Sequence, residues 1–479
     1  MSSLTLDQLI LLLPELLLLL VAIIIMLLPK KAHNFAWALA AVALAVDTLM
    51  CAALWGIEAD IMGGAYRMDN FAVFAKVMLL AMGCINIIGS HDFTETLPKA
   101  REYYALLVVA MLGLIIIPSA TDFITLTIGF ELASIATYTL PMIDSNNPRG
   151  KEAALKYYLM GAFSSAVIIY GLSLLYGFTG SLDIMAAAEV IAVLGVHPLP
   201  ALAYVLLLVG FGYKMAMVPM HMWAADTYEG ASEATTGFIS GVTQKGAFIV
   251  AMKLVLVTFV FWSPVSALLL GVLCAVTMTV GNVMALQQND VKRMLAYSSV
   301  AHAGNIPVGI AVGSVMGVAG SFLHIWAHAL MTIGAFFALR LVAKHKGGTT
   351  LSHFRGLAKQ LPWVSAALML ILLSYGGVPP LLGFWGKMLM VVSAIGRGGW
   401  YTVLAVILVL NSALSLVYYA RVIREMYTKP VEVELIMTPK KGFCSDCWAI
   451  WLTVALLLVM GLLPNMLTEL ASAAAVALW

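Results

Sequence analysis

The sequence predicts an all-α polytopic membrane protein. Hydrophobic residues make up 62% of the 479 residues and charged residues only 10%, and the mean hydropathy is +0.99. A chain of this composition is too apolar for a soluble globule. Apolar runs of about twenty residues recur about fourteen times between charged residues, glycines and prolines, and each run is long enough to cross a bilayer as a helix.

The predicted transmembrane helices begin near residues 4, 34, 71, 103, 121, 152, 200, 232, 264, 294, 317, 362, 400 and 446. No basic region precedes the first of them, so we expect a membrane-spanning helix there and not a cleaved signal peptide. The stretch 181–198, between the sixth and seventh helices, is too short to cross. We expect it to lie at the outer surface.

Two of the predicted helices are interrupted from within. Pro219 breaks the seventh, and Gly376, Gly377, Pro379 and Pro380 break the twelfth. Interrupted helices in corresponding positions are typical of transporters with internal repeats. We therefore predict two five-helix inverted repeats, formed by helices 4–8 and 9–13. The expected divisions are an N-terminal three-helix segment (1–100), a first antiporter-like repeat (101–260), a second (261–430) and a C-terminal helix (431–479).

Lysine and arginine are distributed unequally between the two sides of the predicted membrane domain. Nineteen of the 26 lie in the connections after helices 1, 3, 5, 9, 11 and 13, whereas the opposite side holds only Arg67 and Arg397. The positive-inside rule therefore predicts that both termini lie on the outer side of a cell inner (cytoplasmic) membrane. The net charge of +2 gives no reason to expect a nucleic-acid partner.

Four ionisable residues lie deep within the predicted helices: Glu131, Lys214, Lys245 and Lys387. A charge in hydrocarbon costs at least a few kcal/mol, so such residues indicate a function or a bound partner. An opposite charge about 7 Å away, at an effective dielectric of about 20, stabilises an ammonium by roughly 2.4 kcal/mol. A small movement of a carboxylate can therefore change the protonation of a lysine, which favours a proton relay. A static ion pair between Glu131 and Lys214 is the alternative.

Four histidines accompany these charges. His324 and His328 are four residues apart, so an unbroken helix places both on one face. That spacing suits a metal ion, but only two ligands are visible, and we favour a satisfied or water-lining pair. His221 and His302 fit a hydrated path because histidine titrates near neutral pH. Hydrogen bonds to freed backbone carbonyls are the alternative for both.

Other charged residues have simpler interpretations. Lys76 and Lys253 lie near predicted helix ends, where we expect them to snorkel toward the membrane surface. Asp226, Glu229 and Glu233 follow the broken seventh helix, and we expect them in a solvated cytoplasmic loop. A surface group that collects protons is the alternative for these three acids.

Five cysteines show no disulfide framework. Cys444 and Cys447 form a C-x-x-C at the start of the last predicted helix, with no second ligand pair near them in the sequence. The pattern favours neither a metal site nor a redox role.

Three ordered segments carry a resemblance to a known family. They read GFGYKMAMVPMHMWAADTYEGASEATTGFISGVTQK, LQQNDVKRMLAYSSVAHAGN and GVPPLLGFWGK. Over roughly residues 100–430 the chain is similar to the antiporter-like membrane subunits of respiratory complex I and to Mrp-type sodium/proton antiporters. It most resembles subunit N, because Thr332 stands where larger paralogues carry a lysine and no long lateral helix follows the last span.

The resemblance implies a proton-pumping module without a redox centre of its own. Other membrane and peripheral subunits would hold FMN or FAD, iron–sulfur clusters and a quinone-like carrier. By position, Glu131 matches the family's fifth-helix glutamate and Lys214 its partner on the broken seventh helix. Lys245 matches the central lysine of the eighth helix, and Lys387 matches the twelfth-helix lysine assigned to the outward channel.

Two features depart from a typical subunit N. His324 and His328 are more like the larger subunits, and Asn305 replaces an aromatic residue. An Mrp-type sodium/proton antiporter subunit is the alternative function, and a structural scaffold with static ion pairs is a third. NADH with quinone, reduced deazaflavin with a phenazine, and ferredoxin with plastoquinone all remain open as electron donor and acceptor.

Overall fold

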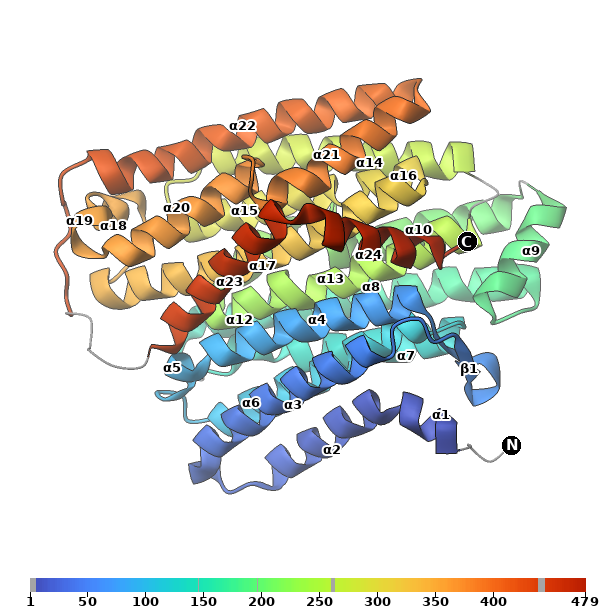
Figure 1. Cartoon of the computed structure of the whole chain (residues 1–479), viewed down its shortest axis with the longest axis horizontal. Coiled ribbons are helices and arrows are strands. Elements are labelled where there is room, and N and C mark those ends of the chain that lie inside the picture. Colours follow the sequence, from blue (N-terminus) through green and yellow to red (C-terminus); the bar gives the residue numbers. More distant parts are fainter. Residues whose placement is uncertain (1–5, 145, 196, 260–262, 438–443) are drawn as a thin grey trace.

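The computed structural model describes residues 6–144, 146–195, 197–259, 263–437 and 444–479. Long helices lie side by side, roughly along the longest axis of the molecule, and the only paired strands in these ranges form one short hairpin (Figure 1). Eleven of the described helices are long and apolar enough to cross a membrane. The all-α polytopic fold is therefore confirmed. The number of fourteen helices, the inverted repeats and the four divisions of the chain stay predictions.

The N-terminal part packs three long helices beside the hairpin. Its elements are α1 (Leu6–Leu11), α2 (Leu13–Leu27), η1 (Lys30–Ala32), α3 (His33–Ala53), β1 (Ala59–Ile61), η2 (Met62–Gly64), β2 (Tyr66–Met68), α4 (Asn70–Gly89) and α5 (His91–Thr94). The two strands are antiparallel, with Asp60 opposite Arg67. Asp69 caps α4 by accepting a hydrogen bond from the Ala72 N–H at 2.8 Å.

The region of the first predicted repeat is also helical. Its elements are α6 (Ala100–Ser119), α7 (Phe123–Tyr138), η3 (Leu140–Met142), α8 (Pro148–Thr179), α9 (Ile184–Leu194), α10 (Pro198–Met215), α11 (Met222–Gly230), α12 (Glu233–Phe238), η4 (Ile239–Thr243), α13 (Gln244–Lys253) and η5 (Leu254–Thr258). The elements η4 and η5 are π-helical turns on either side of α13.

The remaining elements are α14 (Ser263–Leu286), α15 (Val291–Asn305), α16 (Val308–Val312), α17 (Val315–Lys346), α18 (Leu351–Phe354), α19 (Leu357–Gln360), α20 (Pro362–Gly376), α21 (Leu382–Arg397), α22 (Trp400–Thr428), α23 (Ser445–Leu462) and α24 (Pro464–Val476). The helix α17 lies at the centre of the protein. In its most apolar stretch of 18 residues, 94% of the residues are buried. It packs against α4, α12, α20, α21, α23 and α24. Polar side chains on α17 therefore face protein and not lipid.

Both predicted helix interruptions are present. The chain leaves α10 at Ala216, which is left-handed (φ 60°), and Pro219 lies before α11 begins. It leaves α20 at Gly377 (φ 82°), and Pro379 and Pro380 lie before α21 begins. A left-handed residue ends a helix, and proline cannot supply the next backbone donor. The carbonyls of the last turn of α10 and of α20 are thus left for other partners.

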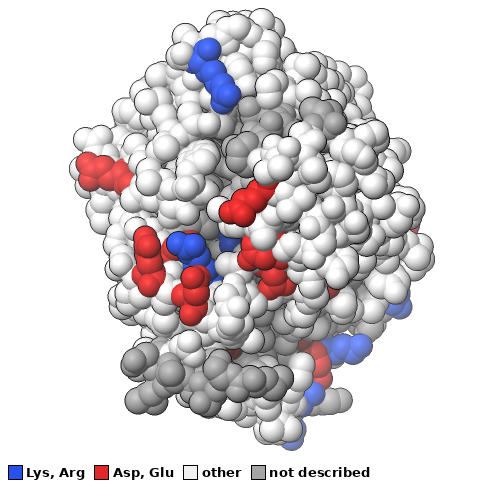
Figure 2. All heavy atoms as spheres, turned by 90° about the vertical axis from the view of Figure 1, so that its right-hand side faces the viewer, with Lys and Arg blue, Asp and Glu red and all other residues white. Residues whose placement is uncertain are grey.

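One end of the helices carries a group of acidic side chains (Figure 2). The hairpin, α9 and the C-terminal end of α24 gather at the right-hand end of Figure 1. Viewed onto that end, several acidic side chains gather around a basic one near the middle of the face (Figure 2). This is the end that the distribution of basic residues predicts to be outside, although the orientation stays a prediction. The short helix α9 lies in the predicted surface stretch, of which residue 196 is outside the described residues.

We expect Gly113→Val to weaken the packing of α6 against α7. A Cβ at Gly113 would lie 2.5 Å from the backbone nitrogen of Ala133 and 2.5 Å from the carbonyl oxygen of Gly129. Overpacking costs about 1–3 kcal/mol, so the melting temperature of the purified protein should fall. Gly177→Val is the matched control, because nothing lies within 4 Å of a Cβ there. An equal fall in both variants would contradict this expectation.

Candidate functional site

Lys214 lies in the last turn of α10 and is buried against α7 and α8. Its Nζ donates hydrogen bonds to Tyr138 Oη at 2.5 Å, Ser134 Oγ at 3.0 Å and Ser165 Oγ at 3.3 Å. Nζ also lies 4.9 Å from the centre of the Phe130 ring, within the range of a cation–π interaction. Three hydroxyl groups and an aromatic face therefore take the place of water around this amine.

Glu131 is positioned by α7 beside Lys214. Ser134 and Tyr138 follow it by three and seven residues, so all three share one helix face. The negative charge of Glu131 acts on Lys214, but none of the three hydrogen bonds of the amine reaches this carboxylate. The structure thus brings the predicted partners together with the ion pair open.

A small cavity separates Lys214 from Gln244. Its volume is about 20 Å³, which is room for about one water molecule. Gln244 lines the cavity, and its Nε2 donates to the carbonyl oxygen of Met215 at 2.6 Å. Its Oε1 accepts a hydrogen bond from Lys245 Nζ at 3.2 Å. One water in this cavity and the amide of Gln244 would therefore connect the two lysines.

Lys245 is the second residue of α13, just after the π-helical turn η4, and it is 0% exposed. Such turns occur frequently at functional sites. Its Nζ lies 2.6 Å from Nδ1 of His328 on α17. This contact joins the regions of the two predicted repeats. An ammonium so close to His328 also disfavours a metal ion there, because the two cations would repel each other.

His302, on α15, lies between His324 and His328. Nδ1 of His302 is 3.0 Å from Nε2 of His324, and the rings of His302 and His328 are 5.0 Å apart. The remaining nitrogen of His302 lies 3.3 Å from Tyr419 Oη. Each of the three histidines is at most 1% exposed. Imidazole both accepts and releases protons near neutral pH, so the cluster can pass a proton among its members.

Lys387 lies on the first turns of α21, beyond the second helix interruption. Its Nζ donates to the backbone carbonyl of Tyr375, in the last turn of α20, at 2.8 Å. The Tyr375 ring lies 5.2 Å from the His302 ring, and its hydroxyl is 2.9 Å from Thr332 Oγ1. Tyr375 therefore connects Lys387 to the histidine cluster.

Seven of the eight predicted site residues form one line, buried except for the partly exposed Glu131, which we name the ionisable row. In spatial order it contains Glu131, Lys214, Lys245, His328, His302, His324 and Lys387. The eighth, His221, stands just before α11, and among the described residues no hydrogen bond or ring contact joins its side chain to the row. Every member of the row can hold or release a proton.

Comparison with known proteins identifies the family of this chain. Residues 120–415 match the family described as NADH:quinone oxidoreductase/Mrp antiporter, TM. The chain belongs to this antiporter family. The family match contains every member of the ionisable row.

Two curated relatives are similar over nearly their full length. F(420)H(2) dehydrogenase subunit N of Methanosarcina mazei is 38% identical, covering 92% of this chain and 91% of the relative. NADH-quinone oxidoreductase subunit N of Trichlorobacter lovleyi is 35% identical, covering 93% and 92%. A chain of respiratory complex I from Thermus thermophilus has the same fold, with a TM-score of 0.80, 29% identity and coverage of 96% and 99%. The antiporter family and the subunit N resemblance predicted from the sequence are therefore confirmed.

The sequence analysis missed the uncharged partners of the row. Gln244 is adjacent to Lys245 in the sequence, and Tyr138 shares a helix face with Glu131, so a search for polar neighbours would have found both. Tyr375 and Tyr419 lie on α20 and α22, whose sequences give no sign that these side chains point toward the histidines. The positions of Tyr375 and Tyr419 beside the histidines are visible only in the folded chain.

Two expectations about charged residues are wrong. Asp226 and Glu229 lie on α11 and not in a loop, although their side chains are still 38% and 34% exposed. Arg293 pairs with both, and Lys156 holds Asp226 at 2.8 Å. Lys76 does not snorkel, because it is 0% exposed and bound to Glu15 at 2.8 Å. The sequence could not show that partners on other helices neutralise these charges.

Glu233 and Lys253 lie at the ends of helices and bind partners there. Glu233 begins α12 and pairs with Lys292 at 2.9 Å, which also places it on a helix and not in a loop. Lys253 donates to the carbonyl of Ala120 at 2.6 Å and lines a cavity of about 160 Å³ beside Arg67. Lys253 therefore reaches toward the predicted outer surface, as expected of a snorkelling lysine.

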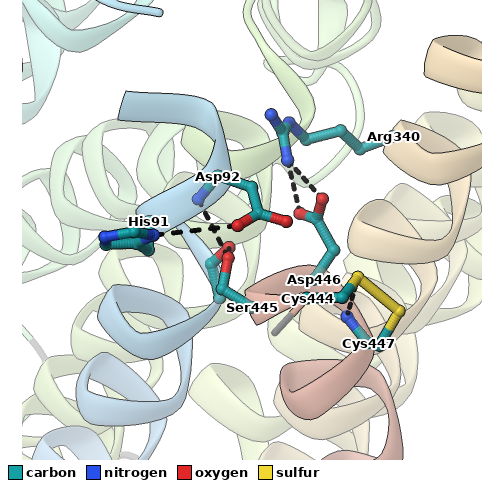
Figure 3. The surroundings of a disulfide bond; sticks show 8 residues. His91, Asp92, Arg340, Cys444, Ser445, Asp446 and Cys447 are labelled. Carbon is teal, nitrogen blue, oxygen red and sulfur yellow. Dashed lines mark hydrogen bonds and ion pairs between the residues drawn. A yellow bond between two sulfur atoms is a disulfide. The ribbon is translucent and has the colours of Figure 1, made fainter. Parts of the chain in front are cut away.

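The C-x-x-C segment forms a disulfide between Cys444 and Cys447 (Figure 3). Between these cysteines, the buried carboxylate of Asp446 accepts two hydrogen bonds from Nη1 of Arg340 on α17. The Cys444 sulfur lies within 4.8 Å of the Asp92 and Asp446 carboxylates. A disulfide sulfur is not a thiolate ligand, and Asp446 is engaged with Arg340, so this group does not offer a metal site in its present state.

We expect Asp446→Ala to destabilise the protein strongly. The side chain of Arg340 is 12% exposed, and breaking a buried pair by removing one partner costs about 3–5 kcal/mol because the other charge is left uncompensated. Thermal unfolding of the purified protein measures the loss. Arg340→Lys keeps the positive charge and should cost less. If both variants unfold at the wild-type temperature, this ion pair does not hold α23 against α17.

Proposed function

We propose that this chain is the proton-translocating subunit, of the subunit N type, of a complex I-like oxidoreductase. The observation that supports this proposal is the ionisable row, which runs from Glu131 to Lys387 through buried lysines and histidines. Relatives named subunit N belong to an NADH-quinone oxidoreductase and an F(420)H(2) dehydrogenase. In this assembly the chain would lie among other membrane and peripheral subunits. Those subunits would hold the flavin, the iron–sulfur clusters and the quinone-like carrier.

The pair of Glu131 and Lys214 serves as the switch in this proposal. When the pair opens, as in this structure, the hydroxyls of Ser134, Tyr138 and Ser165 stabilise the charged amine without the carboxylate. When it closes, Glu131 attracts the ammonium more strongly and withdraws it from the row. Reduction chemistry in neighbouring subunits would bias this equilibrium between two states.

The charge on Lys214 then acts on Lys245 through the cavity at Gln244. A positive Lys214 disfavours a second ammonium nearby, so Lys245 releases its proton more readily when Lys214 is free of Glu131. His328, at 2.6 Å, is positioned to receive that proton. His302 and His324 continue the path toward Lys387, which releases the proton outward, and the backbone carbonyl of Tyr375 orients the amine of Lys387. Lys245 would be reloaded from the cytoplasmic side.

A charged cavity marks the predicted cytoplasmic end. Its volume is about 270 Å³, and it is lined by Arg149, Glu152, Lys156, Asp226, Glu229 and Arg293. Carboxylates in such a cavity hold protons close to the entrance and raise their local concentration. This is the proton-collecting role that the sequence left as the alternative for Asp226 and Glu229. The acidic group on the opposite end (Figure 2) would receive the released protons.

The alternative is an Mrp-type sodium/proton antiporter subunit, since the matched family description includes these antiporters. The same row would then exchange ions without electron transfer. Liposomes that contain this protein and no redox partners separate the two functions. Sodium-dependent proton movement in these liposomes would favour the antiporter and overturn the coupled pump.

We expect Lys245→Ala, in the assembled complex, to lower the number of protons moved per electron. The substitution removes the central proton carrier of the row while the redox subunits stay intact. Proton uptake by sealed vesicles during electron transfer gives the ratio. Lys359→Ala, at an exposed lysine of α19, is the control and should leave the ratio unchanged. Undiminished pumping per electron in Lys245→Ala would rule out the assigned role.

Gln244→Leu should slow pumping in the same assay. Leucine has a similar size but neither accepts the hydrogen bond of Lys245 nor binds a water in the cavity, so Lys214 and Lys245 lose their connection. Gln287→Leu is the matched control at an exposed glutamine. Wild-type pumping in Gln244→Leu would show that the two lysines communicate without this amide.

A further inference from the structure

A second buried group of ionisable residues lies outside the ionisable row, in the N-terminal helices. Lys76 on α4 is 0% exposed, and its Nζ donates to Glu15 Oε1 at 2.8 Å and to Tyr66 Oη at 2.5 Å. The hydroxyl of Tyr66 on β2 donates to the same oxygen of Glu15. The lysine, the tyrosine and one oxygen of the glutamate are therefore fully engaged with one another.

Asp47 on α3 is the fourth member of this group. It is 0% exposed, and neither of its carboxylate oxygens has a hydrogen-bond partner among the described residues. The second oxygen of Glu15 is also buried without a partner. The charged groups that act on Asp47 are Glu15 and Lys76, and the thiol of Cys51 lies one helical turn along the same buried face of α3. Asp47 thus has no hydrogen-bond donor of its own among the described residues.

The charges of the group do not balance if every member ionises. Glu15 and Asp47 would carry two negative charges against the single positive charge of Lys76, since a tyrosine hydroxyl that donates a hydrogen bond is neutral. An ionised carboxylate without partners in an apolar interior is so costly that the carboxylate binds a proton instead. Glu15 shares its charge with the ammonium and Tyr66, so Asp47 is the carboxyl that remains uncompensated.

We propose that Asp47 is a proton-binding site, neutral in its resting state, in a part of the chain that the relay does not use. The ligand is a proton and not a metal cation, because the ammonium of Lys76 acts on the same carboxyl and would repel a bound cation. The site has a physical connection to the core. Tyr66 pairs across the backbone with Ala120, whose carbonyl accepts the hydrogen bond of Lys253 on the helix that carries Lys245.

Infrared spectroscopy of the intact complex in lipid tests this proposal. A protonated carboxyl has a carbonyl-stretch band that shifts when hydrogen is exchanged for deuterium. We expect one such band to disappear in Asp47→Asn, which has the shape of the protonated acid and therefore preserves the fold. Asp60→Asn, at an exposed acid of the hairpin, should leave the band unchanged. Lys245→Ala should also leave it unchanged, so the result is independent of the relay.

Lys76→Met provides a second, opposite result. Without the ammonium, Glu15 becomes uncompensated as well, so the protonated-carboxyl signal should rise by one further band, about a twofold increase for this group. Identical spectra of wild type and Asp47→Asn would overturn the proposal, because Asp47 would then be ionised. A band that appears only after sodium is removed would also overturn it, since a bound cation would then be the neutralising ligand.

Discussion

The cost of placing charge in a low-dielectric interior governs this structure. Each of Lys214, Lys245 and Lys387 is buried, yet none of them forms an ion pair in the described part of the chain. Their hydrogen bonds go to hydroxyls, an amide, an imidazole and a backbone carbonyl. Neutral partners of this kind stabilise an ammonium only partly, so both protonation states remain accessible to the lysine.

The two helix interruptions supply part of this polar environment. Carbonyls in the last turn of a helix have no partner within it. At the end of α10, Gln244 donates to the carbonyl of Met215, and at the end of α20, Lys387 donates to the carbonyl of Tyr375. The negative end of a helix dipole also favours a cation, and Lys214 lies in the last turn of α10. The interruptions thus place acceptors where the row needs them.

The sequence predicted those features that have a strong local cause. The length and apolarity of the runs predicted the helices. Pro219 and the Gly-Gly-Val-Pro-Pro stretch from Gly376 predicted the interruptions, and lysines within apolar runs predicted the row. Side-chain contacts between segments far apart in the sequence have no such local signal. Lys76 looked like a snorkelling residue because Glu15 is 61 residues away, and the position of Tyr419 beside His302 depends on how α22 packs against α15. His221, predicted to lie on a hydrated path because histidine titrates near neutral pH, stands apart from the row, just before α11.

The buried lysines of this chain fall into two classes, and the difference supports the proposed assignment of only some of them to the proton relay. Lys76 is held by a carboxylate, and a direct ion pair in the interior fixes its charge. Lys214 has a carboxylate nearby but bonds to hydroxyls instead, so its charge depends on whether Glu131 approaches. A lysine locked to a counter-ion anchors helices, whereas a lysine whose counter-ion is withdrawn becomes sensitive to small movements. In the N-terminal cluster the proton that can be exchanged is therefore the one on Asp47, and in the core it is the one on the lysines.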